Sequence, residues 1–295
     1  MASEDRLYEF EQALNKIKWD IVGLAEIRRE GEELIKRKNG NYWYYYGESK
    51  GYRGVGFYIS KNIWEKVIEV KPINERICML KLEIDSNTKL AIFQIYAPIL
   101  DANEEEKNQF YETLDAAVRV EKEYFTIVMG DFNGKIGTGT SRNKIYNGIT
   151  GKYAATNNTN NNGERMLEFA LSHRMKIANT FFRKKQNRKW TWVSPDKTIK
   201  NEIDHVLTND ITIIKDVTPL SNFAFPSDHK IIRCRIQIIK RAKYYRNQKK
   251  NKNLRAILPK HKTEEANQYI ETNLINVDYN SPNIQKVYMI SSKAQ

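Results

Sequence analysis

Residues 125–133 read FTIVMGDFN, in which an apolar run, Phe125–Met129, leads directly into Gly130, Asp131, Phe132 and Asn133. A short run of branched and aromatic residues is typical of a buried β-strand. Polar groups at the end of such a strand lie at the edge of a sheet, where loops converge and ligand sites form. This stretch therefore predicts a strand that brings one carboxylate and one amide to the edge of a sheet.

The same arrangement recurs at three other places in the chain. Glu26 follows the apolar run 20–25 (DIVGLA), Asp204 lies in 201–207 (NEIDHVL), and Asp228-His229 stands just before 231–236 (IIRCRI). Clustered carboxylates repel one another unless a cation neutralises them, and Mg²⁺ or Mn²⁺ with oxygen ligands suits this task. With one histidine beside them, the acids predict metal-assisted hydrolysis. The alternative is that each acid is a solvated loop residue.

Strand-like and helix-like stretches interleave along most of the chain. Strands are expected at 42–46, 55–59, 77–84, 90–96, 176–178, 189–193, 202–207, 211–217 and 231–239, and helices near 4–17, 104–120 and 164–174. Many consecutive strands with few crossover helices favour two mixed β-sheets packed together with helices outside. The predicted fold is a four-layer α/β sandwich.

The core pattern stops near Lys240, which predicts a folded domain at 1–240 and a basic, then polar tail at 241–295, partly disordered or helical. The net charge is +13, and residues 240–262 carry ten Lys or Arg and no acid. Such a run attracts a phosphate backbone, so DNA is the expected partner, with RNA as an alternative. A solvated basic linker has the same composition.

Cysteine content and hydropathy indicate where the protein works. The two cysteines, Cys78 and Cys234, lie singly in apolar runs, which excludes a disulfide framework and fits a reducing compartment. The sequence has no apolar stretch of the ~18 residues that a membrane span requires. We expect an intracellular monomer, in the nucleus or the cytoplasm, with no membrane partner.

Four motifs occur in a fixed order: QIYAP at 94–98, GDFN at 130–133, IDH at 203–205 and SDH at 227–229. They resemble the endonuclease/exonuclease/phosphatase superfamily over roughly residues 5–240. Further stretches, such as LAEIRR at 24–29 and GDFNGKIG at 130–137, are similar to LINE-type retrotransposon endonuclease domains and to craniofacial development protein 2-like proteins. The resemblance implies hydrolysis of a DNA phosphodiester by water, leaving a 3′-hydroxyl and a 5′-phosphate.

The resemblance also implies roles for individual residues. Glu26 would hold the metal, and Asp228 would support it. Tyr96 would contact the scissile phosphate. Asp131 would bind or activate the attacking water, and Asn133 would fix its neighbours and the phosphate.

The remaining implied roles concern the histidine and the DNA groove. Asp204 would orient His229, which would bind a phosphoryl oxygen or share the role of base. Thr191, Trp192 and the loop 138–163 would line the groove. Arg76 would touch substrate by its family position, and a surface arginine at the start of a strand is an equal alternative. Trp190 and Trp192 flank Thr191, and for them both core packing and a stacking surface remain open.

The chain departs from the family pattern at its start. Members open with a strand that ends in an asparagine beside the metal, and no such strand precedes the first predicted helix. We therefore expect one sheet to lack a strand and to expose an edge. Two alternatives to an active DNA endonuclease stay open: a catalytically weak or inactive relic that binds nucleic acid, and a phosphodiesterase acting on a lipid or phosphoinositide.

Overall fold

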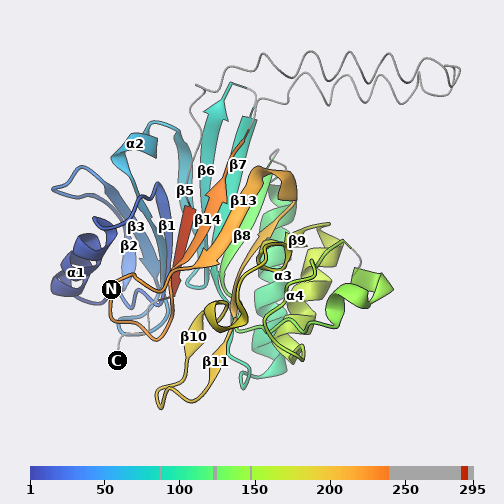
Figure 1. Cartoon of the computed structure of the whole chain (residues 1–295). Helices are drawn as coiled ribbons and strands as arrows, with labels where there is room; N and C mark the ends of the chain where they lie inside the picture. The colour runs from blue at the N-terminus through green and yellow to red at the C-terminus, as the bar shows by residue number, and fades with distance from the viewer. Residues whose placement is uncertain (87, 122–124, 147, 239–286, 292–295) are drawn as a thin grey trace, which may run out of the picture. The chain divides into compact units, whose positions relative to one another are not determined.

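The computed structural model describes residues 1–86, 88–121, 125–146, 148–238 and 287–291. Two large sheets flanked by helices make up most of this part of the chain, as the sequence predicts (Figure 1). The described residues up to Gln237 and the strand at 287–291 belong to one compact unit. No helix within these ranges is long and apolar enough to cross a bilayer.

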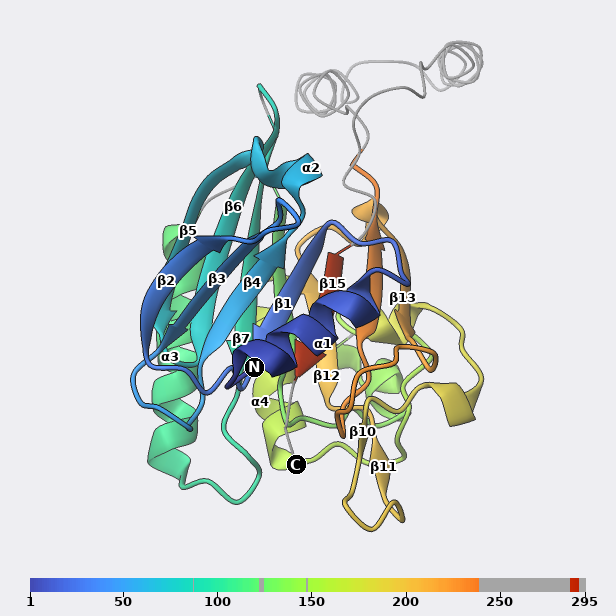
Figure 2. The same cartoon turned by 90° about the vertical axis from the view of Figure 1, so that its left-hand side faces the viewer.

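The first sheet has seven strands in the order β13-β14-β15-β1-β4-β3-β2. Their bounds are β1 (Ile21–Ala25), β2 (Gly31–Lys36), β3 (Tyr42–Gly47), β4 (Val55–Ile59), β13 (Ile214–Pro219), β14 (Ile232–Ile236) and β15 (Val287–Ser291). Helix α1 (Glu4–Leu14) begins at the N-cap Ser3 and covers one face, because Leu7, Phe10 and Leu14 recur at helical spacing and are all buried. Figure 2 shows this helix lying across the sheet.

The second sheet has six strands in the order β5-β6-β7-β8-β12-β9. Their bounds are β5 (Val67–Asn74), β6 (Ile77–Asp85), β7 (Thr88–Tyr96), β8 (Phe125–Asp131), β12 (Asp204–Thr208) and β9 (Lys176–Ile177). Helices α3 (Glu104–Val120) and α4 (Asn161–Ser172) bury Phe110, Leu114 and Met166 in the core of this sheet. The two sheets face each other, since β1 contacts both β7 and β8. Gly23 of β1 allows this approach, because a Cβ there would collide with the side chain of Gln94.

Smaller elements make up the rest of the secondary structure in the described residues. They are α2 (Lys61–Trp64), the hairpin of β10 (Trp192–Val193) with β11 (Lys200–Asn201), and five 3₁₀ turns, η1 (Thr140–Arg142), η2 (Lys144–Tyr146), η3 (Ala178–Phe181), η4 (Gln186–Arg188) and η5 (Ile211–Ile213). The strands predicted at 42–46, 55–59 and 90–96 are present, whereas that at 189–193 keeps only two residues and β2 and β5 were not predicted. Both cysteines are buried free thiols.

The strand β15 was not predicted, and it changes the expectation of an exposed edge. It pairs in parallel with β1 along Ile21–Ala25 and antiparallel with β14 on its other side. The backbone groups of β1 are therefore bonded on both sides, by β15 and by β4. The tail predicted at 241–295 thus contains a sheet strand at 287–291. The boundary predicted at Lys240 and the rest of the tail lie outside the described residues.

The register of the second sheet brings three polar strand ends together. Tyr96 of β7 lies opposite Asp131 of β8 in a parallel pair, and Asp204 of β12 lies opposite the same Asp131 in an antiparallel pair. One row across three strands therefore carries a phenol and two carboxylates.

Candidate active site

Asp131, Asp204 and His229 form a buried cluster, which we call the acid–histidine cluster. His229 Nδ1 lies 2.9 Å from Asp204 Oδ2, and its Nε2 lies 3.9 Å from Asp131 Oδ2. The backbone N–H of His229 donates to Ser227 Oγ at 3.0 Å, and a β-bridge to Trp192 fixes its main chain. The imidazole thus lies between two carboxylates that the sheet register has already aligned.

Burial and mutual charge set the ionisation of the acid–histidine cluster. Burial, reinforced by the charge of Asp204, raises the pKa of Asp131 to about 7. Burial alone would disfavour protonated His229, but the negative charges of Asp204 and Asp131 outweigh it and raise the pKa of His229 to about 9. At neutral pH the cluster therefore holds a charged imidazole beside a carboxyl group close to its titration midpoint.

Glu26 comes directly after β1 and lines the same cavity as Tyr96. It is buried and accepts a hydrogen bond from Arg28 Nη2 at 2.9 Å. Glu26 and Arg28 both have a left-handed backbone, with φ of 52° and 61°, a strain that is common where side chains are aimed at a site. Burial, followed by the charge of Glu26, raises the pKa of Tyr96 above its ordinary value, so its hydroxyl remains a donor.

A cavity of about 320 Å³ opens beside Glu26, Arg28, Arg76 and Tyr96. Arg76 Nη1 donates to the carbonyl oxygen of Tyr96 at 3.1 Å, and its other nitrogen pairs with Glu106. The guanidinium also lies 5.2 Å from the centre of the Tyr96 ring. Arg76 therefore lines the cavity and holds Tyr96 in place, while its contact with substrate stays a prediction.

Asn133 fixes the loop after β8. Its backbone N–H donates to Asp131 Oδ1 at 2.8 Å, and its Nδ2 donates to the carbonyl of Ala97 at 3.0 Å. The left-handed φ of 48° at Asn133 turns the chain back toward the acid. The predicted role of fixing its neighbours has a geometric basis in these bonds.

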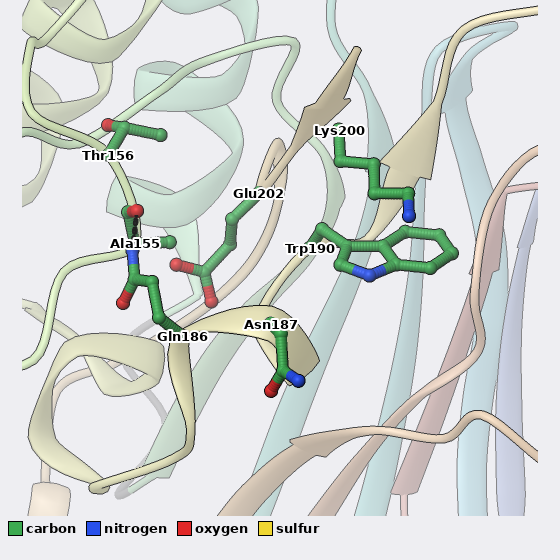
Figure 3. Close-up of a pocket in the computed structure, with 7 residues that line it drawn as sticks. All are labelled: Ala155, Thr156, Gln186, Asn187, Trp190, Lys200 and Glu202. Carbon is green, nitrogen blue, oxygen red and sulfur yellow. Dashed lines mark hydrogen bonds between the residues drawn. The ribbon is translucent and has the colours of Figure 1, made fainter. Parts of the chain in front are cut away.

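Thr191 was predicted to line a surface groove, but its side chain is completely buried. Its Oγ1 accepts the backbone N–H groups of Ile203 and Asp204 at 3.0 and 3.2 Å, so it positions the start of β12. Trp192 is half-buried, and its Nε1 donates to Asp228 Oδ2 at 3.0 Å. Of the loop 138–163, Ala155 and Thr156 line a pocket described below (Figure 3).

The donor atoms present fit a divalent cation. One ligand atom from each of Asp131, Asp204 and His229 lies within 4.8 Å of the others. Asp228 Oδ1 is buried and has no hydrogen-bond partner among the described residues. Because His229 is already bonded to Asp204, the carboxylate oxygens are the ligands available, and they suit a hard divalent ion.

Sequence reasoning gave no role to Asn179 or Arg28, and both support the site. Asn179 Nδ2 donates to the carbonyl of Asp204 at 3.0 Å, and its Oδ1 accepts the N–H of Val206 at 2.9 Å. His205, next to Asp204, takes no part in the cluster, and its Nε2 contacts the carbonyl of Gly134 at 2.8 Å. Arg28 lies in the stretch LAEIRR that resembles the family, which was the available indication.

Known proteins share this fold. Over 198 residues the chain is 29% identical to craniofacial development protein 2 of Tragulus javanicus, a match covering 66% of this chain and 33% of that protein. The chain thus spans about a third of the length of the curated relatives it matches.

Two solved structures have a TM-score of 0.55 to the chain. The 3′ phosphatase NExo from Neisseria, bound to a product DNA hairpin, is 16% identical, covering 80% of this chain and 95% of that one. The endonuclease domain of TRAS1, a telomere-specific non-LTR retrotransposon, is 13% identical, covering 81% and 95%. At these identities the likeness shows the fold alone.

The family resemblance drawn from the four motifs is confirmed by a match that spans most of the chain. The model of the Endonuclease/Exonuclease/phosphatase family matches residues 5–229. The chain therefore belongs to the endonuclease/exonuclease/phosphatase family.

Proposed function

We propose that the chain is a magnesium-dependent endonuclease of retrotransposon origin that hydrolyses the phosphodiester backbone of DNA. The observation that carries the proposal is the acid–histidine cluster, in which a histidine is fixed between two buried carboxylates beside Tyr96 and Glu26. Enzymes of this family are typically dependent on a divalent metal. Since the chain covers about a third of its curated relatives, the proposal concerns this chain and not their full activity.

Asp131 is the base in this proposal. Its pKa of about 7 lets it accept a proton near neutral pH, when the attacking water loses one. The water oxygen forms a bond to phosphorus as the bond from phosphorus to the 3′ oxygen breaks, and the departing oxygen takes a proton from solvent. The products are a 3′-hydroxyl and a 5′-phosphate. The bond from the N–H of Asn133 keeps the Asp131 carboxylate in position.

His229 and Tyr96 bind the phosphate as it gains negative charge. His229 is held by Asp204 through Nδ1, which leaves its Nε2 N–H to donate to a phosphoryl oxygen. Its raised pKa keeps that proton in place at neutral pH. The buried phenol of Tyr96 supplies a second donor from the neighbouring strand.

A cation would be held by Glu26 and supported by Asp228, whose Oδ1 is buried and has no hydrogen-bond partner among the described residues. When bound, Mg²⁺ supplies Lewis-acid stabilisation of the phosphate, and Mn²⁺ has the same preference for oxygen ligands. Arg28 bonds Glu26 and sets the direction of its carboxylate.

Two further facts support DNA over a lipid or phosphoinositide substrate. The net charge of +13 favours a polyanionic substrate. Of the two similar solved structures, one is a 3′ phosphatase bound to DNA and the other is a retrotransposon endonuclease domain. The pairing of β15 with β1 supports an active enzyme over a relic, because the strand that carries Glu26 is bonded on both sides.

The test is nicking of supercoiled plasmid by the full chain in Mg²⁺ and in EDTA. Asp131→Asn is the inactivating variant, and Asp115→Asn is its matched control, because Asp115 also contacts a histidine but lies on α3 outside the site. Nicking that requires Mg²⁺, disappears in Asp131→Asn and persists in Asp115→Asn supports the proposal. A folded chain that shifts DNA in a gel but never nicks it contradicts the proposal and favours the relic.

A further inference from the structure

A second cavity, of about 440 Å³, is not used by the mechanism above. We call it the Trp190 pocket, and Figure 3 shows the residues that line it: Ala155, Thr156, Gln186, Asn187, Trp190, Lys200 and Glu202. They come from the loop after β8, from η4 and from the segment that leads into β12. A volume of this size accommodates one nucleobase.

The Trp190 pocket adjoins the acid–histidine cluster through the chain itself. Glu202 stands two residues before Asp204, and Lys230 follows His229. Asn179 bridges the two sites, because its Nδ2 donates both to Glu202 Oε1 at 3.3 Å and to the carbonyl of Asp204 at 3.0 Å. The two sites therefore share the segment 202–204, along which consecutive Cα atoms are ~3.8 Å apart.

Two ammonium groups lie at the half-exposed indole of Trp190. Lys230 Nζ is 3.1 Å from the ring centre, and Lys200 Nζ is 5.2 Å from it. Figure 3 shows the end of Lys200 beside the indole. Within the described part of the chain, neither lysine forms an ion pair with an acid. The site thus offers one aromatic surface and two positive charges, which suit a base and its phosphate.

The floor of the Trp190 pocket is rigid and compensates its own charge. Glu202 Oε2 lies 3.6 Å from Lys189 Nζ, and both residues are buried. Lys189 Nζ also donates to the carbonyl of Tyr153, and Gln186 Nε2 donates to that of Ala155, which ties η4 to the loop. The acid of the floor is thus paired with Lys189, and Lys200 and Lys230 add positive charge to the pocket.

The sequence around Trp190 gives a second reason to expect that the pocket binds an anionic polymer. Residues 183–200 contain seven Lys or Arg and a single acid, Asp196. Of the basic residues, Lys184 is paired with Asp216, while Arg183, Arg188 and Lys197 are exposed. A positive surface beside an aromatic side chain is the usual arrangement for binding a single nucleic-acid strand.

We propose that the Trp190 pocket binds one unstacked nucleobase of the DNA strand held at the acid–histidine cluster. The base stacks on Trp190, its flanking phosphate contacts Lys200 and Lys230, and the exposed amide of Asn187 at the rim reaches its edge. This assignment rests on the proposed function, and it makes the preferred substrate a strand with an unpaired or displaced base next to the cleaved phosphate.

The experiment measures binding without cleavage. The full chain is titrated in EDTA against two fluorescent single-stranded oligonucleotides, one with all its bases and one with consecutive abasic residues at its centre. The variants are Trp190→Ala and Trp190→Phe. Trp64→Ala is the matched control, because Trp64 is also half-buried but stacks on Tyr42, with ring centres 3.8 Å apart.

We expect Trp190→Ala to weaken binding of the base-bearing strand by about tenfold, the usual loss of one stacked base, and to leave the abasic strand nearly unchanged. Trp190→Phe should retain most of the affinity, and Trp64→Ala should change neither strand. Equal losses on both strands, or no loss on either, would overturn the assignment. So would a free deoxynucleotide monophosphate that binds as tightly as the strand.

These outcomes are separate from those of the nicking test. A chain that shows the base-dependent loss but never nicks plasmid keeps the pocket and rejects the nuclease. A chain that nicks plasmid while Trp190→Ala binds both strands normally rejects the pocket alone.

Discussion

Two Asp–His pairs with nearly equal contact distances lie in different parts of the molecule. We call Asp204–His229 the inner pair and Asp115–His173 the outer pair. Asp204 and His229 are 2.9 Å apart in the acid–histidine cluster, with side chains 2% and 1% exposed. Asp115 and His173 are 2.8 Å apart between α3 and α4, with side chains 33% and 10% exposed. Asp115 is also held by Arg119 at the surface, whereas His229 faces a second buried carboxylate, Asp131.

The difference between the pairs lies in their surroundings and not in their contact distance. At the outer pair, the bond from Arg119 lowers the pKa of Asp115, as is usual for a solvated ion pair. At the inner pair, the negative charges of Asp204 and Asp131 outweigh burial and raise the pKa of His229 to about 9, while burial and the charge of Asp204 raise the pKa of Asp131 to about 7. A hydrogen-bonded Asp–His pair therefore becomes a candidate for chemistry only where burial and further charge perturb it.

The largest expected effect is that of replacing His229, and replacement of His173 is its comparison. His229→Asn should lower the nicking rate by about 10²–10⁴-fold, because a positioned proton-bearing group is lost from the site. His173→Asn should leave the rate unchanged within error. The measurement is the initial rate of plasmid nicking in Mg²⁺ for both variants, with folding checked by circular dichroism. Equal rates for the two variants would remove the distinction between the pairs.

A smaller loss is expected when the orienting acid is changed. Asp204→Asn should lower the nicking rate by about 10–100-fold, the usual cost of losing a supporting partner. In EDTA the same variant should bring the pKa of His229 down from about 9, since the charge of Asp204 is the main cause that raises it. The chain has four histidines, so NMR titration of the imidazoles can follow each one. Asp115→Asn should leave the His229 titration as it is.

The strand β15 supports the inner pair through its neighbours. Met289 pairs with Gly23 of β1 and with Ile232 of β14, which begins three residues after His229. Met289→Pro removes a backbone donor from this ladder and should destabilise the chain by about 1–3 kcal/mol more than Met289→Ala. Thermal unfolding of the two variants is the measurement, and identical midpoints would exclude β15 from the sheet.

The last expected effect is a pH dependence of stability in EDTA. The pKa of His229 in the folded chain is about 9, above its ordinary value of 6.5. Its contribution to stability is therefore complete below about pH 6.5 and is lost as pH rises through 9, by at most about 1.4 kcal/mol per pH unit. The unfolding midpoint should fall over this window, and His229→Asn should flatten the fall. A midpoint that rises equally with pH in both proteins would contradict the charge balance of the cluster.

The sequence could place Glu26 and Asp131 at strand ends because strongly apolar strands lead into them. Phe125–Met129 is buried throughout, so Asp131 had to lie at its end, and the same holds for Glu26 after β1. The order of the four motifs then indicated the family. Strand ends alone left solvated loop residues as an alternative, and the motifs were needed to name Asp131, Asp204 and His229.

Other features depend on contacts that periodicity cannot show. Thr191 was predicted at the DNA groove, but its hydroxyl is consumed by two buried N–H groups at the start of β12. The polar strand β2 has exposed side chains and gives no apolar pattern. β15 joins β1 from the far end of the chain, and such long-range pairing leaves no trace in local sequence. The Trp190 pocket likewise depends on Lys230 reaching Trp190 from a distant segment.

The most direct test of the central claim is the chemistry of the nick itself. Plasmid nicked by the full chain in Mg²⁺ is treated with DNA ligase, which seals only a 3′-hydroxyl next to a 5′-phosphate. Water attack with departure of the 3′ oxygen predicts nicks that the ligase closes without prior end repair, and no nicks in EDTA or with Asp131→Asn. Nicks that resist ligase, or that form equally in EDTA, would contradict a metal-dependent hydrolysis at the acid–histidine cluster.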